Sequence, residues 1–207
     1  MAVEVQGYLG NLSRLLANES NLLAMIDRRK DQTTRKRVSE MSREEMRRLL
    51  LVSEKTGLPN RRAFEEKDPS PFIAMLDVDG LKMLNDKYGY AAGDVLIRRA
   101  AETLVEAGLD AYHDKGDEFI CRGESFQNLK RKLAKAHALL AASPFVVQGM
   151  DDMIRSIAGA TFCFGIGTTL KEAETSLKHQ KELSHKHRES IGLNDEPPNG
   201  RLLDRKY

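Results

Sequence analysis

Three acidic residues lie where predicted strands end or turn, and carboxylates placed in this way can bind a metal. Asp77 follows the apolar run FIAML (72–76), and Asp117 and Glu118 follow the turn-forming cluster DKG (114–116). Carboxylates that lie close together repel one another unless a cation lies between them. Mg²⁺ binds a few carboxylates together with substrate phosphates, which is the arrangement used in two-metal phosphoryl transfer. Acidic residues at strand ends are also often simply solvated, so these three residues alone leave both interpretations open.

The elements around these residues predict an α+β fold that would bring them together. The predicted strands are short apolar runs bounded by turn residues, at 72–76, 109–113, 118–122, 145–147 and 160–166. The predicted helices have apolar residues at three- and four-residue spacings, at 93–106, 125–142 and 170–188. The order of strand, helix, hairpin, helix and strand is the ferredoxin-like βαββαβ arrangement. We expect a mixed sheet with helices on one face and the first strand beside the hairpin.

The chain divides into three zones. Residues 1–52 are a predicted helical segment, in which apolar residues recur at helical spacing over 9–26 and again over 38–52. Residues 53–188 alternate strand and helix signals and form the predicted compact domain. Residues 189–207 contain PPNG and little apolar content, which predicts a flexible tail. The helical segment either packs on its own domain or makes a dimer contact.

The composition excludes several classes of protein. The 207 residues are 41% hydrophobic and 31% charged, so the chain can bury a core and is not disordered overall. It contains no apolar run near the ~20 residues of a membrane span. The near balance of 33 basic and 31 acidic residues argues against a dedicated DNA-binding protein. Cys121 and Cys163 each lie in an apolar stretch, which argues against a disulfide scaffold and for a cytoplasmic location.

Four motifs follow one another along the predicted domain. They are TGLPNRRAF (56–64), DVDGLKMLND (77–86), GYAAGD (89–94) and KGDEF (115–119). Together they resemble the GGDEF domain of diguanylate cyclases, a palm-type version of the ferredoxin-like fold. The resemblance implies an enzyme that joins two GTP molecules into cyclic di-GMP and releases pyrophosphate, with each protomer of a homodimer presenting one GTP. GTP and a second copy of the chain are therefore the expected partners, and neither DNA nor a membrane is expected.

The resemblance also implies which residues bind the metal. Asp77 would hold both metal ions, Mg²⁺ or Mn²⁺, and Val78 would add its backbone carbonyl. Asp117 would be the other metal-binding carboxylate and a candidate to assist deprotonation of the attacking hydroxyl. Glu118 would support the metal site. Asp117 and Glu118 are thus the expected catalytic residues.

The resemblance places substrate contacts at five further residues. Asn85 and Asp94 would read the guanine edge, since a carboxylate there accepts hydrogen bonds that adenine does not offer in the same arrangement. Lys115 and Gly116 of the signature, and Lys181 on the last helix, would contact the substrate. The residue types also allow simpler roles: Asn85 and Asp94 could serve in helix capping and turns, and Lys115 could be an exposed turn residue.

Several positions depart from the family pattern. Lys115 replaces the first glycine of the signature, where glycine lets the backbone approach a phosphate closely. His113 stands where the family has arginine, and Ser53 where it has aspartate; if those two family residues pair, both partners have been replaced together. Tyr90 replaces a histidine near the guanine, and residues 106–109 lack the Arg-x-x-Asp of the usual inhibitory product-binding site.

These observations leave three functions open. The retained carboxylates and guanine-reading residues favour an active diguanylate cyclase. Lys115 and His113 motivate the alternative, a catalytically degenerate domain that acts as a GTP-binding or protein-interaction regulatory module. A related palm-type nucleotide cyclase with another product is the third, and Asp94 argues against it because a carboxylate there favours guanine over adenine.

Overall fold

The computed structural model describes residues 41–190, with side chains described as far as residue 184. The helices are α2 Arg43–Leu51, α3 Arg61–Glu65, α4 Leu81–Tyr88, α5 Tyr90–Glu106, α6 Phe126–Ala142 and α7 Leu170–Ser190. The strands are β1 Phe72–Val78, β2 Asp110–Lys115, β3 Glu118–Gly123, β4 Phe145–Gln148, β5 Ile154–Ile157 and β6 Phe162–Gly167. This mixture of helices and sheet confirms the predicted α+β class.

The main sheet has the strand order β2-β3-β1-β6, and every neighbouring pair is antiparallel. The order is that of the βαββαβ arrangement, with β1 beside the hairpin strand β3. The prediction of a mixed sheet was wrong, because each helical crossover joins parallel strands that are not neighbours. Strand β1 also continues to Val78, so Asp77 lies inside the strand instead of following it.

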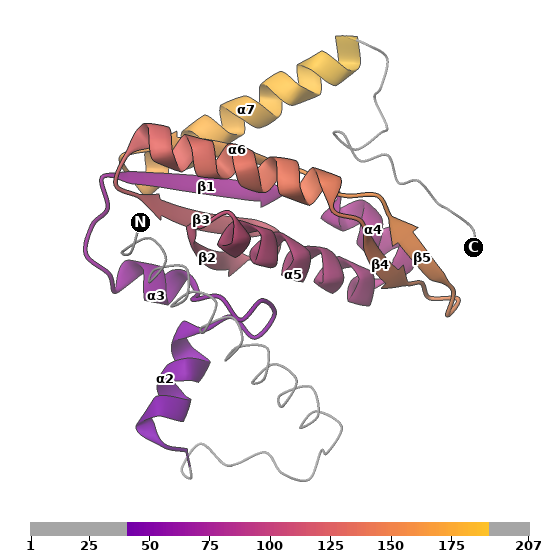
Figure 1. Ribbon diagram of the computed structural model, residues 1–207, viewed down its shortest axis with the longest axis horizontal. Coiled ribbons are helices and arrows are strands. Elements are labelled where there is room, and N and C mark those ends of the chain that lie inside the picture. Colours follow the sequence, from indigo (N-terminus) through magenta and orange to yellow (C-terminus); the bar gives the residue numbers. More distant parts are fainter. Residues whose placement is uncertain (1–40, 191–207) are drawn as a thin grey trace, which may run out of the picture.

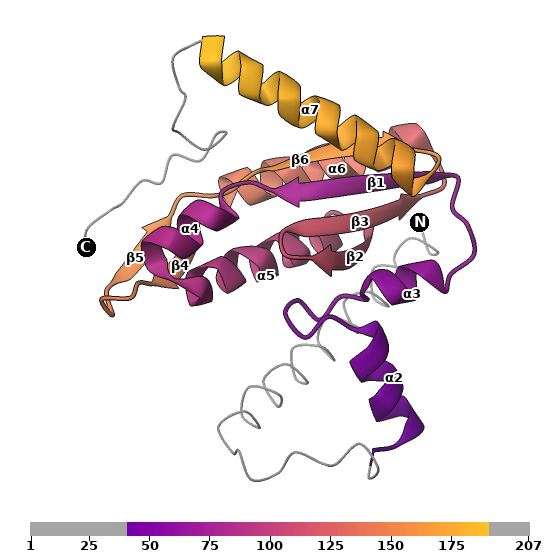
Figure 2. The same ribbon diagram turned by 180° about the vertical axis from the view of Figure 1, so that it is seen from behind.

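Helices cover both faces of this sheet, so the prediction of helices on one face was also wrong. Figure 1 shows α5 and α6 on one side, and Figure 2, seen from behind, shows α7 lying across β1 and β6. Successive residues of a strand point to opposite faces. Ala74 and Leu76 belong to the larger core with α5 and α6, whereas Met75 packs with Leu177 of α7. By the same alternation, Asp77 lies on the α7 face.

A second, two-stranded sheet is inserted between α6 and β6. Strands β4 and β5 pair antiparallel, and the inner residues Phe145, Val147 and Ile157 are buried in the larger core. The sequence predicted β4 but not β5, because the polar Arg155 and Ser156 interrupt the apolar pattern of that strand. The hairpin lies beside α4 and α5 in both views (Figures 1 and 2).

The segment before the domain contains one described helix. The predicted apolar spacing over 38–52 corresponds to α2, which begins with a capping box at Ser42 and Glu45. None of the residues of α2 is buried. The predicted helix over 9–26 lies outside the described residues, as does most of the predicted tail.

Two further expectations concern the whole chain. Cys121 and Cys163 are free; they lie on β3 and β6, on either side of β1, so they form no disulfide with each other. Within residues 41–190, none of the helices combines the length and the apolar character needed to cross a membrane.

Candidate active site

The carboxylates singled out in the sequence meet at one end of β1 and β3. The register pairs Asp77 directly with Glu118, so their side chains share one face of the sheet. The Val78 N–H donates a hydrogen bond to the Asp117 carbonyl at 3.0 Å. Gly116, with φ of +54°, makes the tight turn that returns the chain from β2 to β3. The sheet therefore brings the metal-ligand candidates of both motifs together.

The charges of this cluster act on Asp117 most clearly. Partial burial raises the pKa of the Asp117 carboxyl, the negative charge of Asp77 raises it further, and Glu118 adds to the effect. Lys181 opposes them, and its Nζ lies 2.6 Å from Asp77 Oδ2. Lys115 Nζ lies 3.5 Å from Glu118 Oε2. Two lysines thus offset the negative charge of three carboxylates.

The carboxylate and carbonyl oxygens of these residues suit a hard divalent cation, although they do not form a complete coordination site. Oxygen ligands and surplus negative charge are what Mg²⁺ or Mn²⁺ requires. Among the residues that the structure describes, no three His, Cys, Asp or Glu side chains converge closely enough to hold a metal ion. The ammonium of Lys181 sits against the Asp77 carboxylate where a cation would bind.

The start of α4 is a helix N-terminus next to the carboxylates, and the sequence reasoning did not single it out. The helix begins at Leu81, directly after β1 and the residues Asp79 and Gly80; Gly80, its N-cap, has φ of +86° and no side chain caps the helix. A helix N-terminus carries free N–H groups and a partial positive charge, which favour a phosphate. Asp79 is held by Thr161, whose Oγ1 donates to Asp79 Oδ2 at 2.6 Å. The Asp-Gly pair after a buried strand was the available sequence signal.

The two residues expected to read guanine lie side by side between α4 and α5. Asn85 is on α4 and Asp94 is in the second turn of α5. A Cβ added to Gly93 would lie 1.9 Å from Asn85 Oδ1, so Asn85 lies directly on the backbone next to Asp94. Neither residue caps a helix, because both ends of α4 and the start of α5 are capped by Gly80 or Gly89. The helix-capping alternative is therefore wrong for both.

The structure adds Lys55 to this pair. Its Nζ lies 2.7 Å from Asp94 Oδ1, and the two side chains are 43% and 39% exposed. Lys55 belongs to the loop 52–60, which precedes α3. The sequence reasoning did not single out Lys55, because nothing in its local pattern indicates a partner on α5.

The two substituted family positions contact each other. Ser53 Oγ lies 2.6 Å from His113 Nδ1, and His113 Nε2 lies 3.1 Å from the Gly116 carbonyl oxygen. Since a carbonyl only accepts, Nε2–H donates to it, and Nδ1 then accepts from the Ser53 hydroxyl. Burial lowers the pKa of His113 and favours this neutral ring. The contact connects the signature turn to the loop 52–60.

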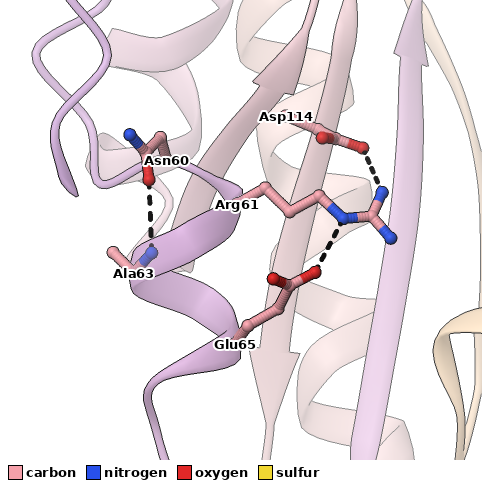
Figure 3. A network of polar contacts seen from close by, with 5 residues as sticks. All are labelled: Asn60, Arg61, Ala63, Glu65 and Asp114. Atoms are coloured by element: carbon pink, nitrogen blue, oxygen red, sulfur yellow. Dashed lines mark hydrogen bonds and ion pairs between the residues drawn. The ribbon is translucent and has the colours of Figure 1, made fainter. Parts of the chain in front are cut away.

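Asn60 and Arg61, at the end of this loop and the start of α3, make contacts that hold the local structure. Asn60 Oδ1 accepts from the Ala63 N–H at 3.2 Å and caps α3. Arg61 binds Glu65 at 3.0 Å and the buried carboxylate of Asp114 at 2.9 Å (Figure 3). Asp114 directly precedes Lys115, so these contacts fasten the loop and α3 to the strand that leads into the signature turn.

Lys115 replaces the first signature glycine. Its side chain is 75% exposed, and its ammonium contacts Glu118 at the edge of the carboxylate cluster. An exposed lysine on a long stem can change its partner without a change in the fold. Lys181 approaches the same cluster from α7, across the sheet from α5 and α6.

The fold and these motifs agree with the comparison to known families. Residues 52–187 match the family described as diguanylate cyclase, GGDEF domain. This match covers well over half of the chain, and the chain therefore belongs to the GGDEF-domain family.

Individual proteins with similar sequences are named diguanylate cyclases as well. Diguanylate cyclase DgcP of Pseudomonas aeruginosa is 30% identical over 135 residues, and the match covers 57% of this chain and 20% of DgcP. Diguanylate cyclase VdcA of Vibrio cholerae is 39% identical over 74 residues, and the match covers 31% of this chain and 22% of VdcA. The matched part is thus about a fifth of the length of these relatives.

Solved structures show the likeness of the fold. Diguanylate cyclase SiaD of Pseudomonas aeruginosa, solved in complex with its activator SiaC, has a TM-score of 0.54 at 22% identity and covers 88% of this chain and 81% of its own. The GGDEF domain of FimX, also from Pseudomonas aeruginosa, has a TM-score of 0.55 at 18% identity and covers 64% of this chain and 94% of its own. At these identities the likeness concerns the fold alone.

Proposed function

We propose that this chain is a diguanylate cyclase, which condenses two GTP molecules into cyclic di-GMP across a homodimer. The observation that carries the proposal is the cross-strand pairing of Asp77 with Glu118, beside an Asp117 whose pKa is raised. Sequence similarity to proteins named diguanylate cyclases supports it. Lys181 and Lys115 pair with Asp77 and Glu118, and Asp117, with its raised pKa, is the carboxylate that would gain most from a bound cation.

In the proposed reaction the 3′-oxygen of one GTP attacks the α-phosphorus of the other. A P–O bond forms, the bond to pyrophosphate breaks, and the hydroxyl proton passes to a base. Asp117 is the candidate to assist this deprotonation, because its carboxylate belongs to the cluster that would hold the metal ions next to the attacking hydroxyl. The two nucleotides then exchange roles: the 3′-oxygen of the second attacks the α-phosphorus of the first, which closes the ring and releases the second pyrophosphate.

Asp77, Asp117 and the Val78 carbonyl would hold the divalent ions, with Glu118 in support. When bound, such ions lower the pKa of the attacking oxygen and stabilise the leaving phosphate. Lys181, which now contacts Asp77, would turn to the phosphates, and the N-terminus of α4 would receive the phosphates of the same nucleotide. Asn85 and Asp94 would bind the guanine.

A product assay tests this proposal. The full chain incubated with GTP and Mg²⁺ should yield cyclic di-GMP, resolved by chromatography, and Asp117→Ala should abolish the product while leaving the circular dichroism spectrum unchanged. Light scattering with and without GTP should detect the homodimer. A well-folded chain that yields no product with either Mg²⁺ or Mn²⁺ would contradict the proposal.

The second candidate is a regulatory module that binds GTP without turning it over. The exposed Lys115, at the position where glycine permits close backbone approach, is the observation in its favour. Calorimetric titration with GTP beside the product assay separates the two candidates. Binding with no product would favour the module, and a Lys115→Gly variant that then gained activity would identify the lysine as the cause.

A further inference from the structure

The ion pair between Lys55 and Asp94 has no role in the reaction described so far. We propose that Lys55 is a specificity-determining residue that recognises the 6-oxo group of the purine, beside Asp94, which recognises the N1 and N2 hydrogens. This inference rests on the proposed function, because it assigns a new contact to the base of the same nucleotide.

The position of Lys55 is fixed by its loop. The Ser53 N–H donates to the Leu58 carbonyl and the Gly57 N–H to the Ser53 carbonyl, both at 2.8 Å. The loop is also tied to the sheet, since the His113 N–H donates to the Pro59 carbonyl at 2.9 Å. These three bonds hold the backbone on either side of Lys55 close enough to α5 for its Nζ to reach Asp94.

The fold itself gains little from the pair. Both side chains are about two-fifths exposed, and an ion pair as exposed as this contributes at most about 1 kcal/mol to stability. Asn85 lies against Gly93, the residue before Asp94, so all three polar residues lie near the start of α5. A group of this kind can recognise a ligand without a large effect on folding.

The donors and acceptors of the group match one edge of guanine. An ammonium has three N–H donors and a carboxylate has about four acceptor positions, so the Lys55–Asp94 contact uses only part of either. Guanine offers two kinds of N–H donor, at N1 and N2, next to the O6 acceptor. Asp94 can accept the first two while Lys55 donates to O6. Adenine has an amino group in place of O6, so it would meet the ammonium with the wrong polarity.

The size of the effect follows from the strength of a charge-assisted hydrogen bond. Such a bond contributes about 1.5–3 kcal/mol, which corresponds to roughly 10- to 150-fold in affinity. Replacement of O6 by sulfur, a much weaker acceptor, should remove much of this without altering the N1 and N2 donors. We therefore expect on the order of tenfold preference for guanine over 6-thioguanine.

The experiment uses calorimetric titration of the full chain with nucleoside diphosphates and Mg²⁺, because diphosphates lack the pyrophosphate leaving group and are not consumed. Wild type should bind GDP about tenfold more tightly than 6-thio-GDP. Lys55→Met should weaken GDP binding and bring this ratio near one, while the ratio of GDP to IDP, which reports on N2 and Asp94, stays unchanged. Lys55→Arg should keep the preference for GDP.

Lys67→Met is the matched control. Lys67 is an exposed lysine that pairs with Asp110 and takes no part in the base-binding group, so its removal should alter neither ratio. A Lys55→Met protein that keeps the wild-type preference for GDP over 6-thio-GDP would overturn the inference. Tighter binding of GDP by this variant would overturn it too, because Lys55 would then only block access of the base to Asp94. If cyclic di-GMP is formed and only the ratio fails, the inference is wrong and the proposed function stands; absence of both GDP binding and product overturns both.

Discussion

Replacement of Asp117 by asparagine should stabilise the metal-free protein while removing its response to Mg²⁺. Asp117 is half buried beside Asp77 and Glu118, and burial and these charges raise its pKa. The folded state therefore disfavours the ionised carboxylate that it carries at neutral pH. Asparagine has the same shape and no charge, so it relieves the repulsion without leaving a cavity.

The expected gain is modest because water reaches part of the site. Asp117 is next in the chain to Glu118, which lies opposite Asp77. Interactions between side chains on neighbouring strands are about 0.2–1 kcal/mol in size, and Lys181 already offsets part of the negative charge. We expect the free energy of unfolding to rise by about 0.5–1 kcal/mol. For a domain of this size, that gain corresponds to an increase in Tm of roughly 1–4 °C.

The gain should depend on pH in a defined direction. A raised pKa means that the folded state takes up the proton more readily than the unfolded state, so the penalty on wild type is complete above the folded pKa. It disappears as the pH falls through that pKa and then below the ordinary value near 3.8. The difference in stability between Asp117→Asn and wild type should therefore be present at neutral pH and vanish in acid.

Thermal unfolding with and without millimolar Mg²⁺ is the assay. Mg²⁺ should raise the Tm of wild type, because it binds only the folded site, and should raise that of Asp117→Asn much less. Asp68→Asn, at an exposed position between α3 and β1, is the control and should change neither value. The reasoning fails if Asp117→Asn is less stable than wild type at neutral pH and still responds to Mg²⁺ as wild type does.

Three further predictions concern the neighbours of the site. Because burial lowers the pKa of His113, its neutral form stabilises the fold above about pH 6.5. Chemical denaturation should show this contribution declining as the pH falls below that value, and His113→Phe should lack the decline. A parallel pH dependence of the two proteins would contradict the assignment. Gly93→Ala should fall short of the gain of about 1 kcal/mol that alanine usually brings inside a helix, since its Cβ would meet Asn85 Oδ1, and adding Asn85→Ala should recover the missing part in the same measurement; equal effects in the single and double variants would show that the clash is not the cause. Lys181→Met should lower the Tm, because it leaves the Asp77 carboxylate, only 15% exposed, without its ion pair, at a cost of about 1–3 kcal/mol; Mg²⁺ should restore more of the Tm in this variant than it adds to wild type, and an equal Mg²⁺ effect would count against a cation site at Asp77.

Most strands and helices of the domain could be located along the chain because apolar periodicity is a local signal. The runs around β1 and β3 and the long amphipathic helices α5 and α6 are each recognisable within a few turns of chain. Helix α4 was missed because its eight residues include Lys82, Asn85, Asp86 and Lys87, which leave too few apolar positions to show a period. The helix packs on the core through its two buried residues, Leu84 and Tyr88, and its polar residues are more exposed.

The contacts between distant segments were beyond the reach of the sequence. The motifs indicated that Asp77 and Glu118 belong to one site, and the register then placed them opposite each other. Nothing local indicated that Lys55 would reach Asp94, because that contact depends on how the loop 52–60 is tied to β2. The antiparallel pairing of all neighbouring strands was likewise not predicted, since the direction of a strand relative to its neighbour depends on the whole topology and not on one segment.

The lysines of the site explain how it can exist without its ligands. The carboxylates Asp77 and Asp94 each contact an ammonium, from Lys181 and Lys55 respectively, and both ammonium groups are on partly exposed side chains. The Lys55–Asp94 pair is exposed on both sides and therefore weak, so a purine could share it at small cost. Asp77 is only 15% exposed, so its ammonium could leave only if a divalent ion took its place. Under the proposed function, Lys181 would then be free to contact the phosphates and Lys55 the base oxygen. Ligand binding would be an exchange of ion pairs, and removal of one lysine should then alter both the stability of the free protein and its selectivity for the ligand.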